Sequence, residues 1–273
     1  TDVVSVAVTG TQTGALSLVD TAGHTLIGLG TSDVTSLTLS NIDTLNLATA
    51  GANLITMTEA QHNQMTAGIT GASTDDRITI AAGNLAAVTT DADVDNYTFG
   101  DDTTNDAYTV TIAASDNVNI TSATATDVVS VAVTGTQTGA LSLINTAGHT
   151  LIGLGTSDVT GLTLSNIDTM NLATGGANLI TMTEAQYDQI TAGITGASTD
   201  DRVTIAAGAI TSITTDADVD NYTFGEDNDG NAYTVTVAAT DNVDLTSAST
   251  DDVMTLAVAG TYTGTLSLED VAG

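Results

Sequence analysis

Short segments in which apolar and polar residues alternate run through the whole chain. Leu45-Asn46-Leu47, Ile78-Thr79-Ile80 and Tyr97-Thr98-Phe99 are typical examples. A period of two predicts a β-strand with one face buried and the other in solvent. Gly, Asn, Asp, Ser and Thr separate the segments, and these residue types favour turns. The pattern therefore predicts an all-β protein made of many short strands.

A long internal repeat organises these segments. The sequence Thr1–Gly10 returns unchanged as Thr126–Gly135, and a looser third copy begins near Asp252. The offset is 125 residues without insertion or deletion, and 100 of the 125 aligned pairs are identical. We therefore expect copy one at residues 1–125, copy two at 126–250, and the start of copy three at 251–273. The chain is then a window on a longer array.

The length of the repeat bears on the fold. A supersecondary unit in a repeat protein usually has roughly 20–50 residues, so a copy of 125 residues contains several units. The short strands and frequent turns favour successive coils of a parallel β-solenoid. The alternative is a row of tandem β-sandwich domains, but such domains usually carry longer strands, Pro in their loops and a buried Trp or Tyr. This chain has neither Pro nor Trp.

One segment in each copy departs from the strand pattern. Residues 58–67 contain few apolar residues at alternate positions, and Thr58 followed by Gln61 matches a capping box at a helix N-terminus. Thr183 and Gln186 repeat the arrangement in copy two. The sequence thus predicts one short helix per repeat.

Charge excludes several classes of partner. The chain has 33 acidic residues, only two cationic ones (Arg77 and Arg202), and a formal net charge of -31. Nucleic acids and anionic membrane surfaces attract Lys and Arg, so neither is an expected partner. No apolar run is long enough for a membrane span. Cys and Lys are absent, which is typical of exported bacterial surface proteins, and we expect an extracellular location.

The acidic residues are mostly Asp, which suits turns and oxygen-ligand metal sites. Asp91-Ala92-Asp93-Val94-Asp95 places acids at alternate positions and recurs as residues 216–220. Acids at positions 1, 3 and 5 resemble a calcium loop, whose twelfth position is also acidic, and a second acidic loop follows at residues 226–231. The predicted calcium ligands are Asp91, Asp93, Asp95, Asp102, Asp216, Asp218, Asp220, Asp227 and Asp229. The alternative is a solvated acidic loop without metal.

Two further acidic pairs have a simpler interpretation. Asp75-Asp76 precedes Arg77, and Asp200-Asp201 precedes Arg202. Local ion pairing accounts for both pairs.

Catalysis receives no support from the sequence. His62 is replaced by Tyr187 in the second copy, and His24 and His149 have no Cys, acid or second His nearby, so we expect them in turns. Phosphate loops, nucleophile elbows and zinc-protease motifs are missing. A polysaccharide-degrading β-helix enzyme would need carboxylates in a cleft with basic groups beside them, and two Arg are too few. We predict that the protein is not an enzyme.

The strand texture of residues 37–47 (Leu-Thr-Leu-Ser-Asn-Ile-Asp-Thr-Leu-Asn-Leu) resembles the repetitive units of bacterial surface-layer proteins and giant secreted adhesins. The resemblance implies a calcium-stiffened extracellular β-solenoid, exported by a one-step secretion route and assembled into a layer or fibre.

Two functions follow as expectations. The first is structural: copies of the protein associate into a surface layer, sheath or filament stabilised by calcium. The second is an adhesin or binding module, in which a Thr-rich face, such as stacked strands like Thr109-Val110-Thr111, meets a cell-surface glycan or ice.

Overall fold

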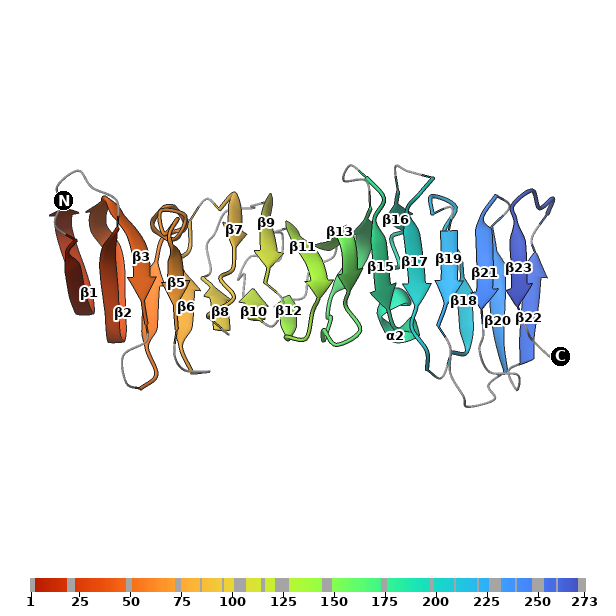
Figure 1. The fold of residues 1–273 in the computed structure, drawn as a ribbon, viewed down its shortest axis with the longest axis horizontal. Helices are drawn as coiled ribbons and strands as arrows, with labels where there is room; N and C mark the ends of the chain where they lie inside the picture. The colour runs from red at the N-terminus through yellow and green to blue at the C-terminus, as the bar shows by residue number, and fades with distance from the viewer. Residues whose placement is uncertain are drawn as a thin grey trace. The chain divides into compact units, whose positions relative to one another are not determined.

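The protein is a parallel β-solenoid of about 10 turns, with 60% of residues in strands and 4% in helices. The computed structural model describes residues 3–18, 23–47, 51–71, 75–83, 85–94, 96–100, 107–113, 116–120, 128–143, 149–172, 176–196, 199–208, 210–219, 221–225, 232–238, 240–246, 253–258 and 260–269. The strand pairs between described residues are parallel (Figure 1). The predicted solenoid is thus confirmed, and antiparallel sandwich domains are not formed.

The chain divides into two compact units, one of Thr1–Val131 with Gly139–Ala147, the other of Ala132–Thr138 with Gly148–Gly273. Strand β11 (Val128–Thr136) contributes residues to both. The other strands of the first unit are β1 (Ser5–Ser17), β2 (His24–Ser40), β3 (Ile42–Asn46), β4 (Leu54–Met57), β5 (Gly68–Thr70), β6 (Arg77–Ile80), β7 (Ala87–Thr89), β8 (Asn96–Phe99), β9 (Ala107–Ile112), β10 (Asn117–Ile120) and β12 (Leu141–Leu143).

Nine strands of the first unit form one sheet. Its order is β12-β10-β8-β6-β4-β2-β3-β5, with β1 beside β2. The long strand β2 turns a corner of the coil, because its first part pairs with β3 and its later part with β4. Strands β7 and β9 pair on another side of the coil.

The second unit repeats this plan. Its strands are β13 (His149–Asp158), β14 (Ile167–Asn171), β15 (Leu179–Met182), β16 (Ile194–Thr195), β17 (Arg202–Ile205), β18 (Ser212–Thr214), β19 (Asn221–Phe224), β20 (Ala232–Val237), β21 (Asn242–Thr246), β22 (Val253–Val258) and β23 (Leu266–Glu269). Strands β13, β15, β17, β19, β21 and β23 follow one another in one sheet, and β18, β20 and β22 form a second.

The core is a stack of aligned apolar side chains. Ile55, Ile78, Tyr97, Val118 and Leu141 are partners on successive strands, and each is at most 1% exposed. Successive partners are 23, 19, 21 and 23 residues apart, so this is the length of a coil here. Each strand thus buries its apolar positions on the coils before and after it, as the alternating pattern predicts.

The predicted helices are confirmed, although they are shorter than the segment assigned to them. Helix α1 (Glu59–His62) and helix α2 (Glu184–Tyr187) each begin with the expected capping box. The Gln of each box has a second role. The Gln61 amide Nε2 donates to the backbone carbonyls of Val34 and Leu37, both at 2.6 Å. The helix therefore provides hydrogen-bond donors for two backbone carbonyls of a neighbouring coil.

A close backbone approach explains one conserved glycine in the repeat. A Cβ atom on Gly71 would lie 2.5 Å from the carbonyl oxygen of Asp93, and one on Gly196 would lie 2.7 Å from that of Asp218. Only Gly leaves space for the acidic turn of the next coil.

Candidate functional site

Register partners form two rows on the outer face of the large sheet in the first unit, and most of their side chains are polar. One row joins Asp33, Thr56, Thr79 and Thr98 as register partners on β2, β4, β6 and β8. The other pairs Leu54 with Arg77 and Arg77 with Asn96. Adjacent strands lie roughly 4.8 Å apart, so the side chains stand at regular intervals. We call Asp33, Thr56, Arg77, Thr79, Asn96 and Thr98 the polar face.

The second unit carries the same polar face. Asp158, Thr181, Thr204 and Thr223 form one row, and Arg202 pairs with Leu179 and Asn221 in the other. Each residue is identical in type to its counterpart 125 positions earlier. Any surface chemistry of this face is therefore repeated once per copy.

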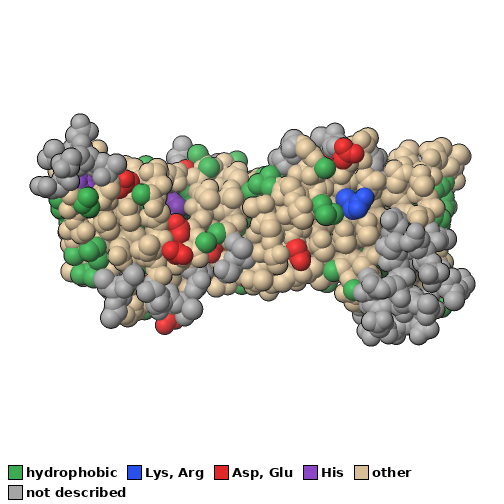
Figure 2. All heavy atoms as spheres, viewed as in Figure 1, with side chains coloured by type: hydrophobic (Ala, Val, Ile, Leu, Met, Phe, Trp, Pro, Cys, Tyr) green, Lys and Arg blue, Asp and Glu red, His purple; other side chains and the backbone are tan. Residues whose placement is uncertain are grey.

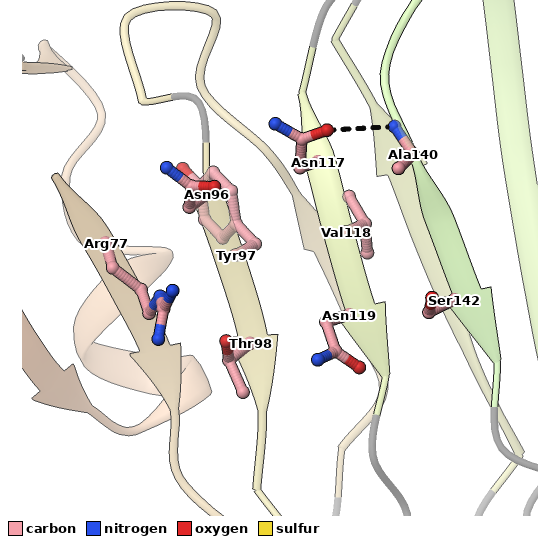
Figure 3. Close-up of a pocket in the computed structure, with 9 residues that line it drawn as sticks. All are labelled: Arg77, Asn96, Tyr97, Thr98, Asn117, Val118, Asn119, Ala140 and Ser142. Atoms are coloured by element: carbon pink, nitrogen blue, oxygen red, sulfur yellow. Dashed lines mark hydrogen bonds between the residues drawn. The ribbon is translucent and has the colours of Figure 1, made fainter. Parts of the chain in front are cut away.

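A shallow groove of about 280 Å³ lies on the sheet next to Arg77. Figure 3 shows its lining on β6, β8, β10 and β12, where Asn117 Oδ1 accepts a hydrogen bond of 3.0 Å from the backbone N–H of Ala140. Asn96, Thr98, Asn119 and Ser142 supply amides and hydroxyls around it. A groove of about 170 Å³ next to Arg202 has matching residues, including Asn221, Thr223, Asn242 and Ser267.

Both Arg side chains are exposed. Between described residues, neither guanidinium forms an ion pair. The face seen in Figure 2 has isolated acidic side chains, cationic atoms at one place, and mainly neutral polar side chains and backbone elsewhere. Arg77 and Arg202 are the only cations of the chain, so the two grooves are the places with local positive charge.

The acid next to each Arg has another role than the ion pair expected from sequence. Asp76 is fully buried, whereas Arg77 points to solvent. Asp76 Oδ1 accepts hydrogen bonds from the backbone N–H and the Nδ2 of Asn53, at 2.9 and 3.2 Å. Asp201 and Asn178 repeat both bonds at 2.8 and 3.1 Å. These acids belong to the interior of the solenoid.

The predicted calcium ligands fall into two groups. Asp91, Asp93, Asp216 and Asp218 lie in described turns, whereas Asp95, Asp102, Asp220, Asp227 and Asp229 lie outside the described residues. The Asp91 carboxyl group accepts hydrogen bonds from the backbone N–H groups of Ile69 and Asp93, at 3.0 and 3.1 Å. Asp216 makes the same two bonds. The first acid of each motif therefore ties its turn to the preceding coil, and the third residue is exposed.

Four of the nine predicted calcium ligands lie in the described part of the chain. In the part of the chain that the structure describes, no three His, Asp or Glu side chains come together as a metal site. Five of the nine predicted ligands lie outside the described residues. Asp93 and Asp218 expose carboxyl groups that remain candidate ligands.

A buried polar contact explains why His62 is exchanged for Tyr187. The Tyr97 hydroxyl accepts a hydrogen bond of 2.8 Å from the backbone N–H of Asp91, and His62 Nε2 lies 3.4 Å from the same oxygen. In copy two, the Tyr187 hydroxyl lies 3.1 Å from that of Tyr222 and donates to the carbonyl of Thr214. Both residue types can share a hydrogen bond with the inner Tyr.

Burial governs the protonation of these groups. Desolvation lowers the pKa of His62 below its ordinary 6.5, against smaller raising effects of Asn63, Asp91 and Glu59. Desolvation also raises the pKa of Tyr187 to about 12. The cluster is therefore neutral near pH 7 and acts as a core contact.

The other two His residues begin strands instead of lying in turns. His24 and His149 are 1% and 2% exposed and are the first residues of β2 and β13. His24 Nδ1 accepts a hydrogen bond of 3.0 Å from the backbone N–H of Val4. His24 thereby joins neighbouring coils.

A Thr-rich surface lies on the smaller sheet of the second unit. Thr234 and Thr236 on β20 are register partners of Ser212 and Thr214 on β18, and Thr255 on β22 continues one row. Hydroxyls thus stand in two adjacent rows over part of this face. On the large sheet most strands present a single outward Thr, so the Thr side chains form only one row there. The two sheets therefore differ in their outward Thr.

Among the described residues, no helix has the length and apolar character to cross a membrane. No protein-family model, curated protein or solved structure matches the chain.

Proposed function

We propose that this protein is an extracellular structural repeat protein whose copies associate into a surface layer, sheath or filament, stabilised by calcium. The observation that carries the proposal is the repetition of surface and core at a constant offset, with 100 of 125 aligned residues identical. The polar faces, the capping boxes and the buried Asn–Asp contacts recur at an offset of 125 residues. A repeated surface suits tiling or spacing, whereas a catalytic site gains nothing from such repetition.

Coil stacking supports an array. Ile78 pairs with Ile55 on one neighbouring coil and with Tyr97 on the other, and it is fully buried. Burying an apolar side chain of this size stabilises a fold by about 1.5–3 kcal/mol. Each coil is therefore stabilised by the coils stacked on both of its sides, as in a long, repetitive array.

The charge supports a role for calcium. With 33 acids and two Arg, copies of this chain repel each other unless cations reduce the charge. Calcium prefers carboxylate and carbonyl oxygens, and extracellular modules bind it at roughly 0.1–1 mM. The exposed Asp93 and Asp218 and the acidic loops after them offer such oxygens.

Sedimentation velocity of the purified chain tests this proposal. We expect large, ordered species to grow with protein concentration in calcium, and to shrink after EGTA is added. A sharp monomer boundary at every concentration and calcium level contradicts the assembly. Assemblies that EGTA leaves unchanged contradict only the calcium part.

The two Thr rows on β18, β20 and β22 favour a second candidate, a module that binds glycan or ice. Hydroxyls at regular spacing can match a repetitive ligand. Thermal hysteresis and binding to a glycan array measure this directly. Substituting Thr214 and Thr236 with Val removes the hydroxyls while preserving side-chain shape, and a binding role predicts loss of the signal.

A further inference from the structure

We propose that the polar face of the large sheet is a self-complementary docking surface, on which Arg77 of one copy binds Asp33 of a second copy and the reverse. Arg202 and Asp158 make the same contact in the second unit. This inference rests on the proposed self-assembly and identifies the surface that performs it.

The arrangement of the two charges fits a two-fold contact. Asp33 lies on β2 and Arg77 on β6, with β4 between them in the same sheet. Two strand spacings separate the charged strands by roughly 10 Å. A two-fold axis that lies between two facing sheets, parallel to both, and bisects the line from Asp33 to Arg77 places Asp33 of a second copy over Arg77 of the first. Each such contact forms two Arg–Asp pairs, as an isologous interface requires.

Both partners have unused hydrogen-bonding capacity. Asp33 Oδ1 accepts from the backbone N–H and the hydroxyl of Thr35, at 3.0 and 2.7 Å. Between described residues, Oδ2 of Asp33 takes no hydrogen bond, and the Arg77 guanidinium donates none. An Arg fork and a carboxylate form strong, oriented hydrogen bonds when they meet.

The surface around Arg77 can receive a carboxylate. The Thr98 hydroxyl lies in the groove and has no hydrogen-bond partner among the described residues. Asn117 uses its Oδ1 on Ala140, so its amide N–H groups remain as donors. The described lining of this groove contains no acidic side chain. The groove therefore offers an incoming carboxylate hydrogen-bond donors and no negatively charged side chain among its described lining.

Repetition of the face makes weak contacts sufficient. One exposed ion pair stabilises very little, because solvent and salt screen it. A two-fold contact nevertheless forms two pairs together, and the same Asp and Arg in each unit let one molecule bind a second copy at either unit. Linked contacts bind far more tightly than one alone.

Two variants with opposite effects on net charge test the contact. R77Q/R202Q changes the net charge from -31 to -33, and D33N/D158N changes it from -31 to -29. The Asn variants retain an oxygen that can accept from Thr35 and Thr160. If general repulsion controlled association, the first variant would weaken it and the second would strengthen it. Our proposal instead predicts that both weaken association, each by about tenfold or more.

A matched control separates charge from position. Q64E/Q189E also changes the net charge from -31 to -33, at residues away from the polar face. We expect this control to associate like the unmodified chain at equal ionic strength. The combined variant R77Q/R202Q/D33N/D158N should associate no more weakly than either pair, because each pair already removes the contact.

Sedimentation velocity in calcium distinguishes the outcomes, with circular dichroism melts to show that each variant folds. Weakened association of both pairs, with an unaffected control, supports the proposal. Stronger association of D33N/D158N, or unchanged association of R77Q/R202Q, overturns this surface and leaves the assembly proposal intact. Polygalacturonate, an acidic glycan, probes the other use of the Arg grooves. If it binds the unmodified chain but not R77Q/R202Q, and D33N/D158N assembles normally, the grooves bind an acidic glycan and the proposed docking surface is overturned too. Absence of assembly in the unmodified chain overturns the proposed function itself.

Discussion

Replacing Asn53 with Ala should destabilise the first unit strongly, because this side chain connects three coils. Asn53 is 2% exposed. Its Oδ1 accepts from the backbone N–H of Gly30 at 2.9 Å, and its Nδ2 donates to Leu47 and to Asp76 at 2.6 and 3.2 Å. Asn178 makes the corresponding bonds in the second unit.

The size of the effect follows from the groups that lose a partner. A typical internal hydrogen bond contributes about 0.5–1.5 kcal/mol, and a buried group left without a partner costs about 1–3 kcal/mol. Leu47 and Asp76 are both fully buried. The backbone N–H of Asn53 continues to donate to Asp76 and limits the loss. We therefore expect Asn53→Ala to lower the unfolding free energy by about 2–4 kcal/mol.

Urea unfolding, followed by far-UV circular dichroism, measures the loss, and hydrogen exchange at Gly30 and Arg77 localises it. Thr98→Ala is the control, because Thr98 lies on the polar face and its hydroxyl forms no hydrogen bond within the described residues. It should change stability by less than about 0.5 kcal/mol. Asn178→Ala should match Asn53→Ala. A loss for Asn53→Ala no larger than that of the control refutes the structural role of the Asn53 side-chain hydrogen bonds.

Acid, the close glycine contact and calcium provide three further tests. Acid should destabilise the unmodified chain more than the His62→Tyr variant, because burial holds the pKa of His62 in the folded state below 6.5 and the unfolded chain therefore binds the proton more readily. The stability contributed by neutral, buried His62 is complete above pH 6.5 and is lost as the pH falls below that value. Equal pH profiles of the two proteins in urea titrations would exclude the effect. Gly71→Ala should cost about 1–3 kcal/mol by pushing away the carbonyl of Asp93, with a similar cost for Gly196→Ala, and thermal melts close to the unmodified chain would contradict this close approach. Calcium at ten times its dissociation constant should stabilise the chain by about 1.4 kcal/mol, and D93N/D218N should reduce this stabilisation. Calorimetry that detects no calcium binding would contradict the proposed role of calcium.

Much of the fold could be predicted from local pattern. The alternation in Ile78-Thr79-Ile80 identifies both the strand and its buried face, because the period of side chains along a strand is two. The pair Thr58 and Gln61 identifies the start of the helix, since a capping box needs only local contacts.

The register between coils could not be predicted in this way. Successive partners along the core are 19 to 23 residues apart, and local alternation contains no signal for that spacing. Asp76 therefore appeared as a partner of the adjacent Arg77, although neighbouring residues in an extended chain point to opposite sides. The pairing of Asp76 with Asn53, and the alignment of Asp33 with Thr56 and Thr79, depend on which coils are stacked.

Electron microscopy of the purified chain in calcium tests the central claim, self-assembly into an ordered material, most directly. We expect regular sheets or filaments, and fewer of them after R77Q/R202Q. Isolated particles at all protein and calcium concentrations contradict it.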